Sequence, residues 1–122
     1  MNQEVKKLWI DVLRSGKYNQ CRGECKSSTV PNSFCAVGVI CEVYRELSPN
    51  LKLEWEYGNL WDSTFGDRYP KKQEAIHAVK RWLGITDTFR IKYKNESIHI
   101  VDLNDCEKMS FEEIADILEK EN

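Results

Sequence analysis

The chain has 122 residues, 41% of them hydrophobic, which is enough for one domain with a buried core and too few for two. Its formal net charge of −2 argues against general nucleic-acid binding, because an excess of basic residues supplies most of the non-specific affinity. No apolar run approaches the roughly 20 residues that cross a bilayer. Residues 1–7 lead into an amphipathic helix rather than a signal-peptide core, so we expect a soluble cytoplasmic protein.

The N-terminal third of the chain predicts a helix followed by a long loop. Apolar residues recur at helical spacing from Val5 to Leu13, and Gly16 is placed to end this helix in a left-handed conformation. Residues 17–31 lack both the helical and the strand period and carry Gly, Ser, Asn and Thr. Loops of this length within a compact domain are often functional.

The middle of the chain predicts a buried helix and a strand. Ser33 is expected to cap a central helix that Pro49 ends, and Gly38 is expected to allow close approach by a neighbouring segment. Residues 51–57 alternate apolar and charged side chains, which predicts a strand with one buried face. Gly58-Asn59 is predicted to turn the chain after it.

The C-terminal half predicts a helix, a hairpin and a last helix. Pro70 is expected at the start of the third helix, which Gly84 ends. Residues 88–94 and 97–101 are predicted strands, joined by a turn at residues 95–96. Ser110 and Glu113 form a capping-box pattern at the start of the last helix. The sequence therefore predicts a single α+β domain, residues 1–122, of four helices and a small three-stranded mixed or antiparallel sheet in the order α-loop-α-β-α-β-β-α.

The five cysteines argue against both disulfides and a metal site. Their number is odd and no export signal is present, so we expect them to be reduced. Their spacing lacks the Cys-x2-Cys pattern typical of zinc sites, and we expect no metal and no cofactor. With two histidines and no recognisable catalytic motif, we assign no catalytic residue and expect binding rather than catalysis.

Two polar clusters in the C-terminal half have simple structural explanations. Arg90, Lys92, Lys94 and His99 are expected on one face of the hairpin, where they could bind phosphate or protect a sheet edge; we favour the second. Residues 102–105 contain Asn104 and Asp105. These are expected to hydrogen-bond backbone amides in the turn from strand to helix.

The candidate binding site is the loop after the first helix. Arginine and lysine supply charge-assisted donors, tyrosine a stacking face, and the flanking glycines allow a ligand to approach the backbone. The alternative is a solvated loop in which Gly16 only ends the helix. Trp61, expected in an irregular stretch after the first strand, is a further candidate as a stacking wall. The predicted ligand contacts are Arg14, Lys17, Tyr18, Gln20, Arg22 and Trp61.

Three segments of the chain resemble a family of small uncharacterised bacteriophage and prophage proteins. They are LRSGKYNQCRG at 13–23, FCAVGVICEVY at 34–44 and LNDCEKMSFEEIADILE at 103–119. The family pattern reads LRSGKY-Q-RG, CCLGVLCELY, P--V--WLG and LND--SFEEIADIIE, and the resemblance runs from residue 9 to residue 119.

The resemblance implies an accessory protein that serves counter-defence or host takeover. It would act by capturing a host protein or by sequestering a nucleotide-like immune signal, as a monomer or a homo-oligomer. Two alternatives stay open. One is an enzyme that acts on a small phosphorylated molecule through the same loop, and the other is a regulator associated with nucleic acid.

Overall fold

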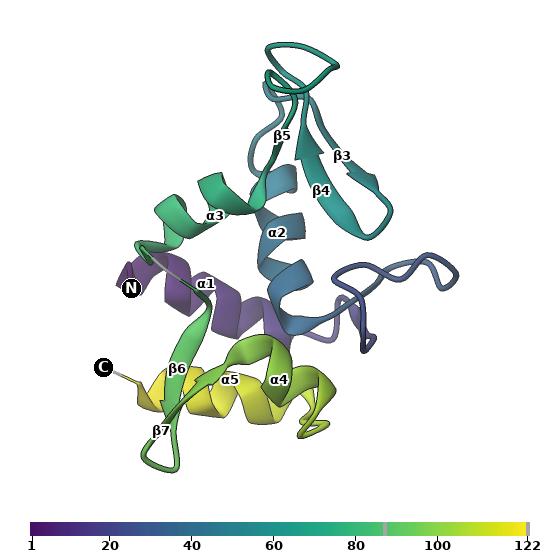
Figure 1. The fold of residues 1–122 in the computed structure, drawn as a ribbon. Helices are drawn as coiled ribbons and strands as arrows, with labels where there is room; N and C mark the ends of the chain where they lie inside the picture. The colour runs from purple at the N-terminus through teal and green to yellow at the C-terminus, as the bar shows by residue number, and fades with distance from the viewer. Residues whose placement is uncertain (87, 122) are drawn as a thin grey trace.

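The computed structural model describes residues 1–86 and 88–121 of the chain. This part contains five helices and seven short strands (Figure 1). The helices are α1 (Gln3–Arg14), α2 (Ala36–Glu46), α3 (Ile76–Leu83), α4 (Ile100–Asp105) and α5 (Phe111–Lys120). The predicted α+β class is confirmed, with one helix more than expected.

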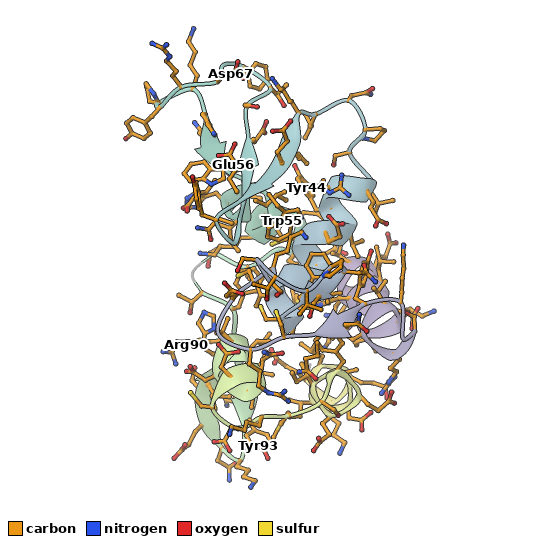
Figure 2. The ribbon with its side chains drawn as sticks, turned by 90° about the vertical axis from the view of Figure 1, so that its right-hand side faces the viewer. Tyr44, Trp55, Glu56, Asp67, Arg90 and Tyr93 are labelled. Carbon is orange, nitrogen blue, oxygen red and sulfur yellow. The ribbon has the colours of Figure 1, made fainter. Side chains whose placement is uncertain are left out.

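The strands form three separate sheets instead of the single predicted one. The first pairs β1 (Asn19–Gln20) with β2 (Ser33–Phe34) in parallel; the second is the antiparallel β3 (Leu53–Glu56), β4 (Asn59–Asp62) and β5 (Gln73–Glu74); the third pairs β6 (Arg90–Tyr93) with β7 (Glu96–His99). The two antiparallel sheets lie at opposite ends of the molecule, where Glu56 and Asp67 mark one end and Arg90 and Tyr93 the other (Figure 2).

The core forms around α2, which is apolar on nearly all sides of its first two turns and is buried there. α1 packs beside it, and the fully buried indole of Trp9 donates a hydrogen bond of 2.9 Å to the carbonyl of Ala36. α5 covers the other side of α1 (Figure 1). The predicted amphipathic first helix is confirmed, and Gly16 follows it with a φ of +74°.

The predicted cap of α2 was wrong by two residues. Ser33 belongs to β2, and pairing with β1 keeps the chain extended through Phe34. The N-cap is Cys35, whose Sγ accepts a hydrogen bond of 3.4 Å from the amide of Gly38. The close approach expected at Gly38 is confirmed, because a Cβ there would lie 1.9 Å from the carbonyl oxygen of Cys25.

The region between the first predicted strand and α3 differs from expectation. β3 is confirmed, but a tight turn with positive φ at Tyr57 and Gly58 leads directly into β4. Trp61 therefore lies in a strand and not in an irregular stretch. Pro70 does not open a helix; α3 begins only at Ile76, because the intervening β5 pairs with β4. Gly84 ends α3 in the left-handed conformation, as predicted.

The predicted hairpin is confirmed as β6 and β7, with its turn at Lys94-Asn95 instead of residues 95–96. The second strand is shorter than expected, because α4 begins at Ile100 and takes the place of the predicted turn at 102–105. The imidazole of His99 caps this helix and accepts a hydrogen bond of 3.1 Å from the amide of Val101.

Both hydrogen bonds of the predicted capping box are present at the start of α5. The Ser110 hydroxyl accepts from the Glu113 amide, and the Glu113 carboxylate accepts from the Ser110 amide, each at 3.1 Å. Replacing Ser110 with alanine is expected to lower the free energy of unfolding by about 1 kcal/mol, because an amide in the first turn loses its acceptor. Chemical denaturation tests this against Ser48→Ala, a serine outside the helices; equal midpoints for the two variants would contradict a role for the cap.

Candidate functional site

The loop after α1 is attached to the rest of the molecule by the side chains that the sequence suggested as ligand contacts. Arg14, at the end of α1, pairs with three carboxylates of α5: its guanidinium lies 2.6 Å from Asp116, 2.8 Å from Glu119 and 3.4 Å from Glu112. Hydrogen bonds to Glu119 and Asp116 raise the pKa of Arg14. This arginine therefore joins the first and last helices.

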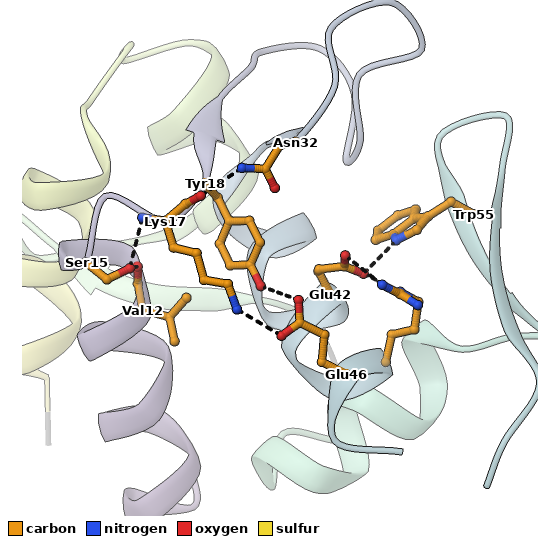
Figure 3. A network of polar contacts seen from close by, with 9 residues as sticks. Val12, Ser15, Lys17, Tyr18, Asn32, Glu42, Glu46 and Trp55 are labelled. Atoms are coloured by element: carbon orange, nitrogen blue, oxygen red, sulfur yellow. Dashed lines mark hydrogen bonds and ion pairs between the residues drawn. The ribbon is translucent and has the colours of Figure 1, made fainter. Parts of the chain in front are cut away.

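Lys17 and Tyr18 meet at one carboxylate near the end of α2 (Figure 3). The Tyr18 hydroxyl donates to Glu46 at 2.8 Å, and the Lys17 ammonium lies 3.1 Å from the other oxygen of the same carboxylate. Tyr18 is only 6% exposed, and burial together with this hydrogen bond raises its pKa to about 12. Its ring faces the core and is not free to stack on a ligand.

Gln20 and Arg22 hold the connection between α4 and α5. Gln20 donates to the side-chain oxygen of Asn104 at 2.8 Å and to the carbonyl of Met109 at 2.7 Å. Arg22 donates to the carbonyls of Asn104 at 2.9 Å and Lys108 at 3.2 Å. These donors satisfy backbone and side-chain acceptors that lie more than 80 residues further along the chain.

The five loop residues therefore contact three different parts of the protein and do not converge on one open surface. Lys17 is open to solvent, with a side chain that is 57% exposed. Ligand binding by these residues stays a prediction, and a ligand would have to compete with the internal contacts of each. The sequence indicated that these polar residues have a role. No pattern near them in the chain identified the distant residues that they contact.

The sixth candidate, Trp61, lies on the outer face of the β3–β4–β5 sheet. The antiparallel register places it directly between Glu54 of β3 and Glu74 of β5. Side chains directly opposite one another share a face of the sheet. The Lys72 ammonium lies 5.5 Å from the centre of the Trp61 ring and 2.7 Å from the carboxylate of Glu56, which belongs to the same face. We call Glu54, Glu56, Trp61 and Glu74 the outer sheet face.

A hollow of about 360 Å³ opens beside Trp61. Tyr69, His77 and Lys72 contribute to its wall. This volume is at the lower end of the range for small-molecule sites, roughly 300–1,000 Å³.

Three large aromatic side chains in the turn and the loop of the β3–β4–β5 sheet are exposed to solvent, and one of them, Tyr69, lines the hollow beside Trp61. Tyr57, at the turn between β3 and β4, is fully exposed, and the loop from β4 to β5 presents Phe65 and Tyr69 at 79% and 88% exposure. Phe65 and Tyr69 lie in a stretch without a periodic signal, and the alternation over residues 51–57 placed Tyr57 on the buried face of a strand, so none of the three was recognised as a candidate. Exposed aromatic side chains gathered on one part of a small domain are typical of a surface that binds another molecule.

The chemistry of the outer sheet face suits a cation better than an anion. An indole ring attracts a positive charge through its electron-rich face, and three carboxylates beside it add to that attraction. Lys72 already occupies such a position within the protein. In residues 1–86 and 88–121, no group of three or more His, Cys, Asp or Glu side chains is arranged to hold a metal ion.

These features define a small α+β protein with an acidic and aromatic face on a projecting sheet. The chain belongs to the family described as a domain of unknown function (DUF8296), whose model matches residues 1–122. No curated protein and no solved structure matches the chain. Within the described residues, no helix is both long enough and apolar enough to cross a membrane.

Proposed function

We propose that this protein is a phage-type accessory protein that captures a host protein in the bacterial cytoplasm, in the service of counter-defence or host takeover. The binding surface is the outer sheet face together with the exposed aromatic residues around it. The observation that carries the proposal is the position of Trp61 between two glutamates with a lysine ammonium over its ring. A partner surface with lysine or arginine side chains complements this arrangement.

The charges favour a protein partner over a nucleotide-like signal. A phosphate group beside Trp61 would meet the carboxylates of Glu54, Glu56 and Glu74, whereas Lys72 already pairs with one of them. An arginine of a partner would instead stack on the indole and pair with the carboxylates. Exposed Tyr57, Phe65 and Tyr69 supply the rigid apolar area from which interface hot spots are built.

The test is affinity capture from a lysate of the host bacterium with matched surface variants. Trp61→Ala is expected to weaken binding of the captured protein by about 2 kcal/mol or more, which is roughly thirtyfold in Kd, the cost typical of a central tryptophan. Reversing charge with Glu54→Lys and Glu74→Lys is expected to abolish capture by repelling basic side chains. Titration of the purified partner gives the affinities.

Glu107→Lys is the matched control, because Glu107 is an exposed carboxylate beyond α4, in a different part of the fold. It makes the same charge change and is expected to bind like the parent. Equal loss with Glu107→Lys would contradict a specific role for the outer sheet face. Calorimetric titration with nucleoside monophosphates and cyclic dinucleotides is expected to show no heat of binding. Nucleotide binding that Trp61→Ala removes would instead support sequestration of a nucleotide-like signal.

A further inference from the structure

Two cysteines that are ten residues apart in the chain face one another beside α2. Lys26 and Phe34 form an antiparallel bridge, and one residue further on the Cys35 amide donates a hydrogen bond of 3.0 Å to the Cys25 carbonyl. This register places Cys25 directly opposite Cys35. Opposed residues of this kind have Cα atoms about 5.5 Å apart and side chains on the same face. Disulfides join Cα atoms roughly 4.4–6.8 Å apart, so the pair has the spacing that a disulfide requires.

The two thiols differ in environment. Cys35 is 2% exposed and caps α2, whereas Cys25 is partly exposed and lines a cavity of about 220 Å³ between α2, α3 and the β3–β4–β5 sheet. A hydrogen bond with the Cys35 thiol lowers the pKa of Cys25, while the same contact and burial raise the pKa of Cys35. The accessible member of the pair is therefore the one that ionises first, which is the property of an attacking thiol.

We propose that Cys25 and Cys35 form a dithiol pair that exchanges with low-molecular-weight disulfides such as glutathione disulfide, with Cys25 as the attacking thiol and Cys35 as the resolving thiol. The two cysteines do not belong to the outer sheet face, although Glu74 also lines the cavity beside Cys25, and the inference goes beyond the proposed function. In the first step the Cys25 thiolate attacks one sulfur of the disulfide. A mixed disulfide forms, and the other half leaves as a thiolate.

In the second step Cys35 attacks the Cys25 sulfur and releases the second half. Two protein thiols are oxidised and one small disulfide is reduced to two thiols, which take up the two protons that Cys25 and Cys35 lose. The product is a Cys25–Cys35 disulfide that closes residues 26–34 into a loop at the start of α2. Excess reduced glutathione reverses both steps, so the reduced cysteines expected in the cytosol are the resting form.

Cys41 is a possible competitor, because it lines the same cavity. It belongs to α2 and is 3% exposed. The backbone register does not place it opposite Cys25. We expect it to remain a core thiol.

To test this, the full chain is treated with glutathione disulfide, and the remaining thiols are blocked with iodoacetamide. The protein is then digested with trypsin in the absence of reductant. Cleavage after Arg22, Lys26 and Arg45 places Cys25 in peptide 23–26 and both Cys35 and Cys41 in peptide 27–45. The expected product is these two peptides joined by a disulfide. The link is lost after treatment with reductant.

Single variants separate the roles of the cysteines. Cys35→Ser, which keeps a residue suited to capping α2, is expected to stop at a glutathione adduct on peptide 23–26. Cys25→Ser is expected to give neither the link nor a glutathione adduct on Cys35. Cys41→Ser and the exposed-site control Cys106→Ser are expected to form the link as fully as the parent.

Three results would overturn the proposal. They are a linked product that persists in Cys35→Ser, a glutathione adduct on Cys25 that the parent never resolves, and a parent whose cysteines stay unmodified. None of these bears on capture of a partner by the outer sheet face, which Trp61→Ala tests independently.

Discussion

Replacing Gly38 with alanine is expected to destabilise the protein by roughly 3 kcal/mol, the upper part of the range for overpacking a well-filled core. An alanine Cβ would lie 1.9 Å from the Cys25 carbonyl oxygen and 2.8 Å from its carbonyl carbon. Both atoms belong to the backbone, so a side-chain rotation cannot relieve the contact. The segment that carries Cys25 would have to move away from α2.

Destabilisation by this substitution would be specific to the packing at Gly38, because glycine-to-alanine changes in a helix usually stabilise it. Gly38 lies inside a helix without a positive φ, and in an open helix the same substitution would stabilise by about 1 kcal/mol. Chemical denaturation of Gly38→Ala measures the difference. Ala78→Gly in α3 is the control, since it reports helix propensity and is expected to cost about 1 kcal/mol. A Gly38→Ala protein as stable as the parent would mean that Cys25 does not pack against α2 in solution.

Asn104→Ala is expected to lower the free energy of unfolding by roughly 2–4 kcal/mol, because it leaves more than one buried polar group without a partner. The side chain of Asn104 is fully buried. Its oxygen accepts from Gln20 at 2.8 Å and from the Ala36 amide at 3.2 Å, and its nitrogen donates to the Cys21 carbonyl at 2.9 Å. One amide group therefore joins the loop after α1, the start of α2 and α4.

Hydrogen exchange gives a second readout for the same variant. The Ala36 amide is expected to exchange faster in Asn104→Ala than in the parent, because it loses its side-chain acceptor. Asn50→Ala is the matched control, since Asn50 is exposed in the turn after α2, and its stability is expected to stay within about 0.5 kcal/mol of the parent. An Asn104→Ala protein that unfolds like the Asn50 variant would refute the bridging role.

The sequence determined those elements whose signals are local and repeated. The apolar period over residues 5–13 identified α1, alternation identified β3 and the β6–β7 hairpin, and Ser110 with Glu113 identified the start of α5. In each case the pattern extends over several residues, and the cap or turn contacts neighbours within four positions. Such contacts form between residues that are close in the chain, so the sequence alone carries the information.

Short elements were beyond the reach of these patterns. β5 has two residues and α4 has six, too few for the strand period or the helical period to repeat clearly. β5 forms because β4 supplies its partner, and α4 is capped by His99 at the end of β7. Both elements depend on contacts with neighbouring segments, and their own residues carry no clear pattern. For this reason a turn was expected at 102–105 and a helix from Pro70.

Only the tertiary structure decided what the polar residues do. Arg14, Gln20 and Arg22 have the composition of a ligand loop, but their acceptors lie 82 to 105 residues further along the chain. The spacing of Cys25 and Cys35 in the sequence did not indicate that they form a pair. The antiparallel register places them opposite one another. The sequence shows which side chains can donate a hydrogen bond, whereas the packing of distant segments decides which acceptor each of them reaches. The sequence therefore determined which chemical groups are available, and the packing of α4 and α5 against the loop after α1 decided which of them are engaged within the protein.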